Sequence, residues 1–411
     1  MAKEKIMIIG AGRYQVPIIE KAKEMGYETI AVSPQGAYPG LDIADKVYYL
    51  DVRDEKGILN VARGEKVSGV TTDQTDIAVR TVAYVCTHTG LSGIDYDTAT
   101  LFTNKLMMRE RSRQLGLPTI RYKLCRSLDD AKTFFASLGR SAILKPVDNQ
   151  GSRGVYMIES MKELEKRFYD TLTFSPTGQA IIEEYIHGRE FEVDSIVVNY
   201  EEKTLMYADT DLYSIPNVFA SKTRLYPSVA DSESIEKLLD LNHKTITGFG
   251  LKQGLTHSEY IQDEETGEIY LIEAAARGGG SYISSHIAEL QTGVNTSEFL
   301  INLALGKVKE MPEFETGRCH CGYVTFYLPE GEVIDVGEID KVRSFSFVKK
   351  DTLDDIYPGL KTLSFNDKTA RNVVIVDAGS REELLANIET IRKTLNTKVM
   401  TRNGIEGPIW R

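Results

Sequence analysis

The chain has 411 residues, of which 42% are hydrophobic and 27% are charged, with a net charge of -11. This length exceeds one ordinary core and predicts two to four domains. No apolar run approaches the ~20 residues that a bilayer-spanning helix needs, and the acidic charge argues against general nucleic-acid binding, which relies on clustered Lys and Arg.

The N-terminus enters a strand-like run directly, without the longer apolar segment of a secretory signal. The four cysteines are too few and too scattered for a disulfide framework. We therefore expect a cytoplasmic protein. Cys319 and Cys321 flank His320, but this spacing has no second pair, so alternating strand residues are favoured over a zinc site.

The first ninety or so residues alternate short apolar runs, beginning with KIMIIG, with amphipathic stretches such as QVPIIEKAKEM and a helix near Glu55 to Arg63. This βαβ pattern predicts a parallel sheet. The turn GAGRYQ carries only a G-x-G. It fits an anion site at a helix start and a simple tight turn equally well.

A second domain begins near Thr98, with helices in NKLMMRERSRQLG and near Leu128 to Leu138. The strand AILKPV follows, and then GVYMI, QAIIEEYI, EFEVDSIVV and TLMYAD, which indicate strands of an antiparallel sheet. After a polar patch at 214–224 we expect a helix at 232–248 and the strands GLTHSEYIQ and EIYLIEAA. The tail from Lys309 has short strands and a last helix at 382–395.

Lys145 ends an apolar strand and precedes a glycine-containing loop at 150–154. An ammonium beside free backbone amides suits a polyphosphate, although the order differs from that of a P-loop. A hairpin with a surface lysine is the alternative. In IIEEYIHGREFEVD, Glu183 and Glu184 end a strand and Glu190 follows, which suits nucleotide contacts or a solvated sheet edge.

Glu259 and Glu273 lie fourteen residues apart on two strands joined by a turn at 263–267. Folded as a hairpin, the two carboxylates should lie opposite each other on one face. Their repulsion is relieved by a cation, and beside polyphosphate hard oxygen ligands favour Mg²⁺.

Together, Asn104-Lys105, Lys145 with its GSRG loop, EEYI-x-G-x-E, and Glu259 and Glu273 followed by Arg277 resemble the ATP-grasp superfamily. The resemblance covers about 98–305, and the preceding region is similar to the domain that accompanies this fold in carbamoyl phosphate synthase, biotin carboxylase and bacterial L-amino acid ligases. It implies a mixed α/β and α+β fold. The expected parts are a parallel βαβ pre-ATP-grasp domain at 1–97, a two-subdomain ATP-grasp fold at 98–308 and a small C-terminal α/β domain at 309–411.

The resemblance also implies residue roles. Lys105 and Lys145 would bind the ATP phosphates, Gln150 to Gly154 would form a lid, and Glu259 and Glu273 would hold Mg²⁺. Lys145 is also expected to be catalytic together with Arg277. The other expected ATP-binding residues are Gly151, Ser152, Arg153, Gly154, the hinge residues Glu183, Glu184, Tyr185 and Ile186, and Glu190 on the ribose.

The family usually has E-x-N-P-R where this chain has E-A-A-A-R, so Ala275 replaces a metal-binding asparagine and leaves one or two Mg²⁺ as alternatives. Arg277 is expected to bind the carboxylate or the transferred phosphoryl group. Substrate binding is further expected at Gly278, Gly279, Gly280 and Ser281. His257 and His286 are expected to be packing residues or hydrogen-bond donors behind the site. For Asp73 and Asp76, binding of an amine and capping of a helix are equal alternatives.

These features favour an ATP-dependent carboxylate-amine ligase that phosphorylates a small acid, transfers the acyl group to an amine and releases ADP and phosphate. The implied partners are small-molecule substrates, without nucleic acid or membrane, and the tail either closes the site or forms a homodimer. Two alternatives stay open. One is a bicarbonate-phosphorylating enzyme of the carboxylase type, and the other is an ATP-binding protein without turnover.

Overall fold

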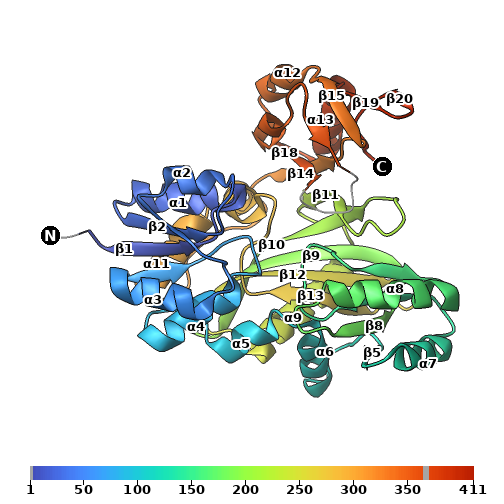
Figure 1. Ribbon diagram of the computed structural model, residues 1–411, viewed down its shortest axis with the longest axis horizontal. Coiled ribbons are helices and arrows are strands. Elements are labelled where there is room, and N and C mark those ends of the chain that lie inside the picture. The colour runs from blue at the N-terminus through green and yellow to red at the C-terminus, as the bar shows by residue number, and fades with distance from the viewer. Residues whose placement is uncertain (1–2, 364–369) are drawn as a thin grey trace.

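The computed structural model describes residues 3–363 and 370–411, and Figure 1 shows the arrangement of their elements. The N-terminal part contains a parallel sheet in the spatial order β3-β2-β1-β4, as the βαβ pattern predicts. Its strands are β1 (Lys5–Ile9), β2 (Glu28–Ser33), β3 (Lys46–Tyr49) and β4 (Gly69–Thr71). Residues 6–9 of β1 are fully buried, as expected of a central parallel strand covered on both faces.

Amphipathic helices cover this sheet and lead into the second domain (Figure 1). The elements are η1 (Arg13–Gln15), α1 (Val16–Glu24), α2 (Pro39–Ile43), α3 (Glu55–Glu65), α4 (Val79–Thr89), α5 (Tyr96–Leu101) and α6 (Lys105–Gln114). Asn104 caps α6 by accepting a hydrogen bond from the backbone N–H of Met107, which fixes where the helix begins. The cap therefore determines the position of Lys105, the first residue of α6.

The strands expected to form one antiparallel sheet belong to two sheets. The smaller one has the order β5-β8-β6-β7, with all neighbours antiparallel. Its strands are β5 (Tyr122–Cys125), β6 (Ala142–Pro146), β7 (Tyr156–Ile158) and β8 (Ala180–Glu184), packed against α7 (Leu128–Leu138) and α8 (Met161–Thr173). Helix α7 has the predicted bounds.

The larger sheet has eight antiparallel strands in the order β13-β12-β9-β10-β11-β14-β18-β16. The strands are β9 (Gly188–Val198), β10 (Glu201–Leu212), β11 (Ser221–Tyr226), β12 (Gly254–Asp263), β13 (Ile269–Ala275), β14 (His320–Phe326), β16 (Val348–Asp351) and β18 (Asn372–Ala378). Strand β11 begins within the segment expected to be a polar patch. Its polar residues form a strand because β10 and β14 pair with it on either side. Helix α9 (Ser232–Phe249) matches the helix predicted at 232–248 and packs on this sheet.

The C-terminal segment is joined to the preceding part of the chain through the larger sheet, since β14, β16 and β18 are members of it. A separate small sheet has the order β17-β15-β19-β20 and stands above it in Figure 1. The strands of this sheet are β15 (Gly331–Asp335), β17 (Lys361–Thr362), β19 (Lys398–Thr401) and β20 (Gly404–Glu406). The helices of the C-terminal segment are α12 (Ile339–Ser344), η3 (Leu353–Asp355) and α13 (Arg381–Thr394).

After β13 the chain returns to the N-terminal part through η2 (Ile283–Ile287), α10 (Ala288–Thr292) and α11 (Thr296–Ala304). Ile301 of α11 lies in one apolar core with Ile6 and Ile18 of the first domain and Tyr323 of β14. This shared core links the first domain and the larger sheet. Within the described ranges, no helix combines the length and apolar character needed to cross a membrane.

Candidate active site

Two carboxylates face each other on the β12–β13 hairpin. Glu259 pairs directly with Glu273 in the strand register, which confirms the arrangement predicted from their spacing. Their side chains are 24% and 31% exposed. Each carboxylate has a cationic neighbour, because Lys105 Nζ donates to Glu273 Oε1 at 2.8 Å and Arg224 forms an ion pair with Glu259. These cations offset the repulsion between the two carboxylates.

The acidic pair fits Mg²⁺ as a donor set. Both side chains offer hard carboxylate oxygens and keep some exposure, so an ion held there can also bind phosphate oxygens and water. Ala275 ends the same strand, pairs in register with His257 and is buried. Its methyl side chain has no ligand atom, whereas Glu259 and Glu273 each offer carboxylate oxygens.

A second group of charges is buried where β6 and β8 meet. Lys145 Nζ lies 2.7 Å from Glu183 Oε2, and Arg109 Nε donates to Glu183 Oε1 at 2.9 Å. Burial raises the pKa of Glu183, but Arg109 and Lys145 outweigh this and lower that pKa to about 2. Burial lowers the pKa of Lys145, and its attraction to Glu183 offsets only part of this effect.

The two shifts have one explanation. A single carboxylate serves two buried cations, so this group carries one surplus positive charge and Lys145 is undercompensated. An incoming phosphate oxygen would supply the missing negative charge. The placement of Lys145 is therefore compatible with the phosphate-binding role expected for it.

The loop after β6 turns tightly through residues in the left-handed backbone region. Gly151, Ser152 and Gly154 all have positive φ values, of 70°, 59° and 74°. At Gly154 an added Cβ would lie 2.8 Å from the side chain of Phe174, so this position requires glycine for space as well as conformation. The carbonyl of Asn149 accepts a hydrogen bond from Lys105 Nζ at 2.8 Å. The base of the loop is thus tied to the acidic pair through Lys105.

The expected hinge residues, which are the last two residues of β8 and the two that follow, lie in different environments. The side chain of Glu183 points to Lys145 and Arg109, whereas that of Glu184 pairs with Arg140 at 3.0 Å. Tyr185 donates its backbone N–H to Ser141 O at 3.0 Å. Ile186 belongs to a small apolar cluster whose other members are Ile120, Ile261, Tyr270 and Ile272. An apolar surface beside backbone groups suits a planar purine ring.

The glycine run after β13 packs against the first domain. An added Cβ at Gly278 would lie 2.5 Å from Asp73 Oδ1, and one at Gly279 would lie 2.8 Å from His257 Nδ1. Close internal packing therefore accounts for these two glycines, while the nearest atom to a Cβ at Gly280 is 4.0 Å away. Ser281 follows with a φ of 57° and is buried. Space for a substrate is greatest at Gly280.

Arg277 reaches across to the loop between β4 and α4. Its Nε and Nη2 donate to Asp76 Oδ1 and Oδ2 at 2.8 and 2.9 Å, which is a bidentate pair. Burial lowers the pKa of Arg277, but Asp76 outweighs this and the pKa is raised overall. The guanidinium stays charged and lies close enough for electrostatic attraction to both Glu259 and Glu273. The structure thus brings Lys105, Glu259, Glu273 and Arg277 to one place.

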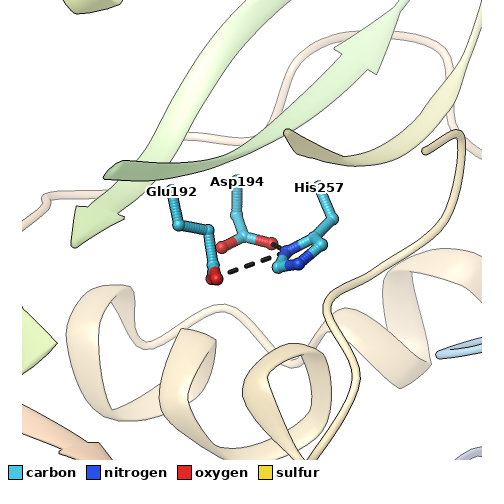
Figure 2. A group of neighbouring side chains, drawn as sticks. All are labelled: Glu192, Asp194 and His257. Carbon is cyan, nitrogen blue, oxygen red and sulfur yellow. Dashed lines mark hydrogen bonds and ion pairs between the residues drawn. The ribbon is translucent and has the colours of Figure 1, made fainter. Parts of the chain in front are cut away.

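Figure 2 shows a buried group next to this site, formed by Glu192, Asp194 and His257. Their ligand atoms lie within 4.8 Å of one another. Arg224 Nη1 lies 2.9 Å from His257 Nε2, so Nε2 accepts and Nδ1 carries the proton that it donates to Asp194 Oδ1 at 2.9 Å. Because both ring nitrogens are engaged, we interpret the group as a charge network.

Arg224 connects this network to the acidic pair. It forms ion pairs with both Glu192 and Glu259, and the hydroxyl of Tyr226 donates to Glu192. The sequence prediction did not include Arg224, Glu192 or Asp194. The available signal was the alternation in EFEVDSIVV, which places acidic residues at every second position of an otherwise apolar strand.

Residues 138–285 match a family model described as ATP-grasp domain. Carbamoyl phosphate synthase large chain of Clostridium botulinum (strain Kyoto / Type A2) is 24% identical over 417 residues, covering 93% of this chain and 38% of its own length. Alanine–anticapsin ligase of Bacillus subtilis is 26% identical over 276 residues, covering 62% of this chain and 58% of its own. The chain thus spans less than two thirds of either relative.

Two solved structures confirm the fold. L-amino acid ligase from Bacillus licheniformis superposes with a TM-score of 0.84 at 20% identity, covering 98% of this chain and 100% of that one. The biotin carboxylase domain of 2-oxoglutarate carboxylase from Hydrogenobacter thermophilus, solved with MgADP, ADP and bicarbonate, superposes with a TM-score of 0.74 at 17% identity, covering 99% and 92%. The expected mixed α/β and α+β architecture is therefore confirmed.

Proposed function

We propose that this chain, whose residues 138–285 match the ATP-grasp domain model, is an ADP-forming ligase that activates a small carboxylate with Mg-ATP and joins it to an amine. The observation that carries the proposal is the convergence of Glu259 and Glu273 with the cations Lys105, Arg224 and Arg277. Paired carboxylates ringed by cations suit a metal-bound polyphosphate next to a second anion. The matches to alanine–anticapsin ligase and L-amino acid ligase support the same reaction class.

In this proposal ATP lies between the smaller sheet and the β12–β13 hairpin. The Ile186 cluster contacts adenine, Glu190 binds the ribose, and Lys105, Lys145 and the 150–154 loop hold the phosphates. Glu259 and Glu273 would hold Mg²⁺, which would supply positive charge against the negative charge that develops during phosphoryl transfer. Ala275 leaves these two carboxylates as the protein's contribution to that site.

The proposed chemistry has two steps. A carboxylate oxygen of the substrate attacks the γ-phosphorus of ATP, the bond to the β–γ bridging oxygen breaks, and ADP leaves the acyl phosphate behind. An amine then attacks the acyl carbon, phosphate leaves with the bonding electrons, and the amine loses its proton. Arg277 orients the acid and stabilises the transferring phosphoryl group through its N–H fork. Arg224 supports this arrangement by holding Glu259 in place.

Bicarbonate as the phosphorylated acid is the second candidate. It is supported by the match to carbamoyl phosphate synthase large chain over 93% of this chain. The two candidates differ in what must be added for ADP to form: bicarbonate, or an organic acid with an amine.

Phosphorus NMR of the protein with Mg-ATP, pooled amino acids and bicarbonate, with each component omitted in turn, tests the proposal. ADP and phosphate that require an organic acid and an amine support the ligase, and a requirement for bicarbonate selects the second candidate. Formation of AMP and pyrophosphate would contradict phosphoryl transfer. Binding of Mg-ATP with no turnover across these mixtures would favour an ATP-binding protein without enzymatic activity.

A further inference from the structure

The edge of the Arg277 guanidinium that is best suited to a substrate anion already holds a carboxylate of the protein, that of Asp76. The Nε and Nη2 edge is filled by both oxygens of Asp76, at 2.8 and 2.9 Å, and Nη1 donates to Gly278 O at 3.0 Å. The side chains of Arg277 and Asp76 are 14% and 18% exposed. The Nε and Nη2 edge, which presents two parallel donors, is therefore already occupied by a carboxylate of the protein itself.

The loop that carries Asp76 is held in place independently of this ion pair. Gln74 accepts a hydrogen bond from the backbone N–H of Tyr282 at 2.9 Å and donates to Tyr14 O at 3.0 Å. Gln15 donates to Asp73 O at 2.7 Å. These contacts connect the loop to η2 and to the first domain, so the carboxylate of Asp76 is presented to Arg277 by a preformed backbone.

The same loop is also tied to the expected lid. The backbone N–H of Asp76 donates to Gln150 Oε1 at 2.9 Å. Gln150 follows Asn149, whose carbonyl accepts from Lys105. The Asp76 loop is therefore connected to Lys105 through two hydrogen bonds, one from Asp76 to Gln150 and one from Lys105 to Asn149.

From this geometry we propose that Asp76 is a specificity-determining stand-in for the anionic group of the substrate. It occupies the fork of Arg277 until an anion able to form the same bidentate pair displaces it. Weakly paired anions are thereby screened out. This inference rests on the proposed function, in which Arg277 binds the substrate carboxylate or the transferred phosphoryl group.

Inorganic phosphate is a suitable probe, since it is a product of the proposed reaction and matches the fork. Its dissociation constant should be measured by isothermal titration calorimetry in the presence of MgADP at fixed ionic strength. Removing the competing charge in Asp76→Asn should tighten phosphate binding about tenfold. Asp76→Ala should behave similarly, and Asp76→Glu should stay close to wild type.

Asp51→Asn is the matched control, because Asp51 pairs with Arg53 on the exposed surface of the same domain and its loss changes net charge equally. It should leave phosphate binding unchanged. Arg277→Ala separates the inference from the function on which it rests. Unaltered phosphate affinity in Arg277→Ala would overturn the assignment of Arg277 and the inference together. Loss of binding in Arg277→Ala, with equal or weaker binding in both Asp76→Asn and Asp76→Ala, would overturn only the inference.

Discussion

Lys105 Nζ donates a hydrogen bond to Glu273 Oε1 at 2.8 Å and thereby ties the first residue of α6 to the last strand of the acidic hairpin. The same ammonium donates to Asn149 O at the base of the 150–154 loop. One side chain thus connects the expected phosphate loop with the expected metal carboxylates, which are separated by more than a hundred residues in the sequence. The predictions below follow from this arrangement.

Glu273→Gln should reduce Mg²⁺-dependent ADP formation by roughly a hundredfold or more, because the neutral amide is a poor replacement for a charged metal ligand. The fold should persist, since Glu273 is partly exposed. Initial rates over a range of Mg²⁺ concentrations, with thermal melting as the check on folding, measure both effects. Glu264→Gln changes an exposed residue at the turn of the same hairpin and serves as control. Equal turnover in the two variants would contradict the assignment of Glu273.

Arg277→Lys should lower kcat by about a hundredfold while the dissociation constant for Mg-ATP changes by less than about threefold. Lysine retains the charge but lacks the planar fork that Arg277 uses toward Asp76. Single-turnover rates and nucleotide binding by fluorescence separate the two quantities. A large loss of Mg-ATP affinity with an unaltered rate of phosphoryl transfer would instead place Arg277 at the nucleotide.

Gly154→Ala should weaken Mg-ATP binding, because its φ is 74° and the new Cβ would lie 2.8 Å from the side chain of Phe174. Gly151→Ala has a similar φ of 70°, but the atom nearest to its new Cβ, Arg153 Nε, is 3.8 Å away. The comparison isolates the steric effect from backbone strain of about 1 kcal/mol. Calorimetric titration of Mg-ATP should show the larger loss for Gly154→Ala. Identical losses would mean that the contact with Phe174 is unimportant.

Glu183 should contribute to acid sensitivity. Its pKa is lowered from an ordinary value of 4.5 to about 2, so the folded state favours the ionised form. The corresponding stability is fully present above pH 4.5 and is lost as the pH falls from there through about 2. Glu183→Gln should therefore flatten the stability profile in this window.

The same substitution should destabilise the protein at neutral pH by about 3–5 kcal/mol, because Arg109 and Lys145 remain buried without their carboxylate. Chemical unfolding between pH 2.5 and 7 measures both effects. Glu184→Gln, which alters a surface pair with Arg140, is the control and should change stability by less than about 1 kcal/mol. An unchanged pH profile in Glu183→Gln would show that the pKa of Glu183 is the same in the folded and unfolded protein.

Local sequence patterns predicted those features that depend on neighbouring residues. The spacing of Glu259 and Glu273 around one turn was sufficient to place them opposite each other, because the connection leaves a hairpin few registers. Helix α7 was predicted with its observed ends, where Ser127 caps the first turn and Gly139 takes a left-handed conformation after the last. Because a capping residue precedes this helix and a glycine follows it, both of its ends can be predicted from the sequence.

Strand β11 was predicted less well. Residues 214–224 were expected to be a polar patch, yet Ser221–Tyr226 forms a strand between β10 and β14. Its polar side chains are satisfied by distant partners, as when Arg224 meets Glu192 and Glu259. A polar strand of this kind has no local signal, because its stability comes from neighbours that adjoin it only after folding.

The sequence by itself determined the parallel first domain and the acidic hairpin, because these features depend on periodicity, turns and short spacings. The candidate lysine, glycine and arginine positions followed from the superfamily resemblance. The tertiary structure alone decided which charges meet: Lys145 with Glu183, Arg224 with Glu259, and Arg277 with Asp76. It also decided that β14, β16 and β18 extend the larger sheet. The physical reason is that ion pairing and strand pairing between remote segments are selected by the packing of the whole chain, which local sequence patterns do not specify.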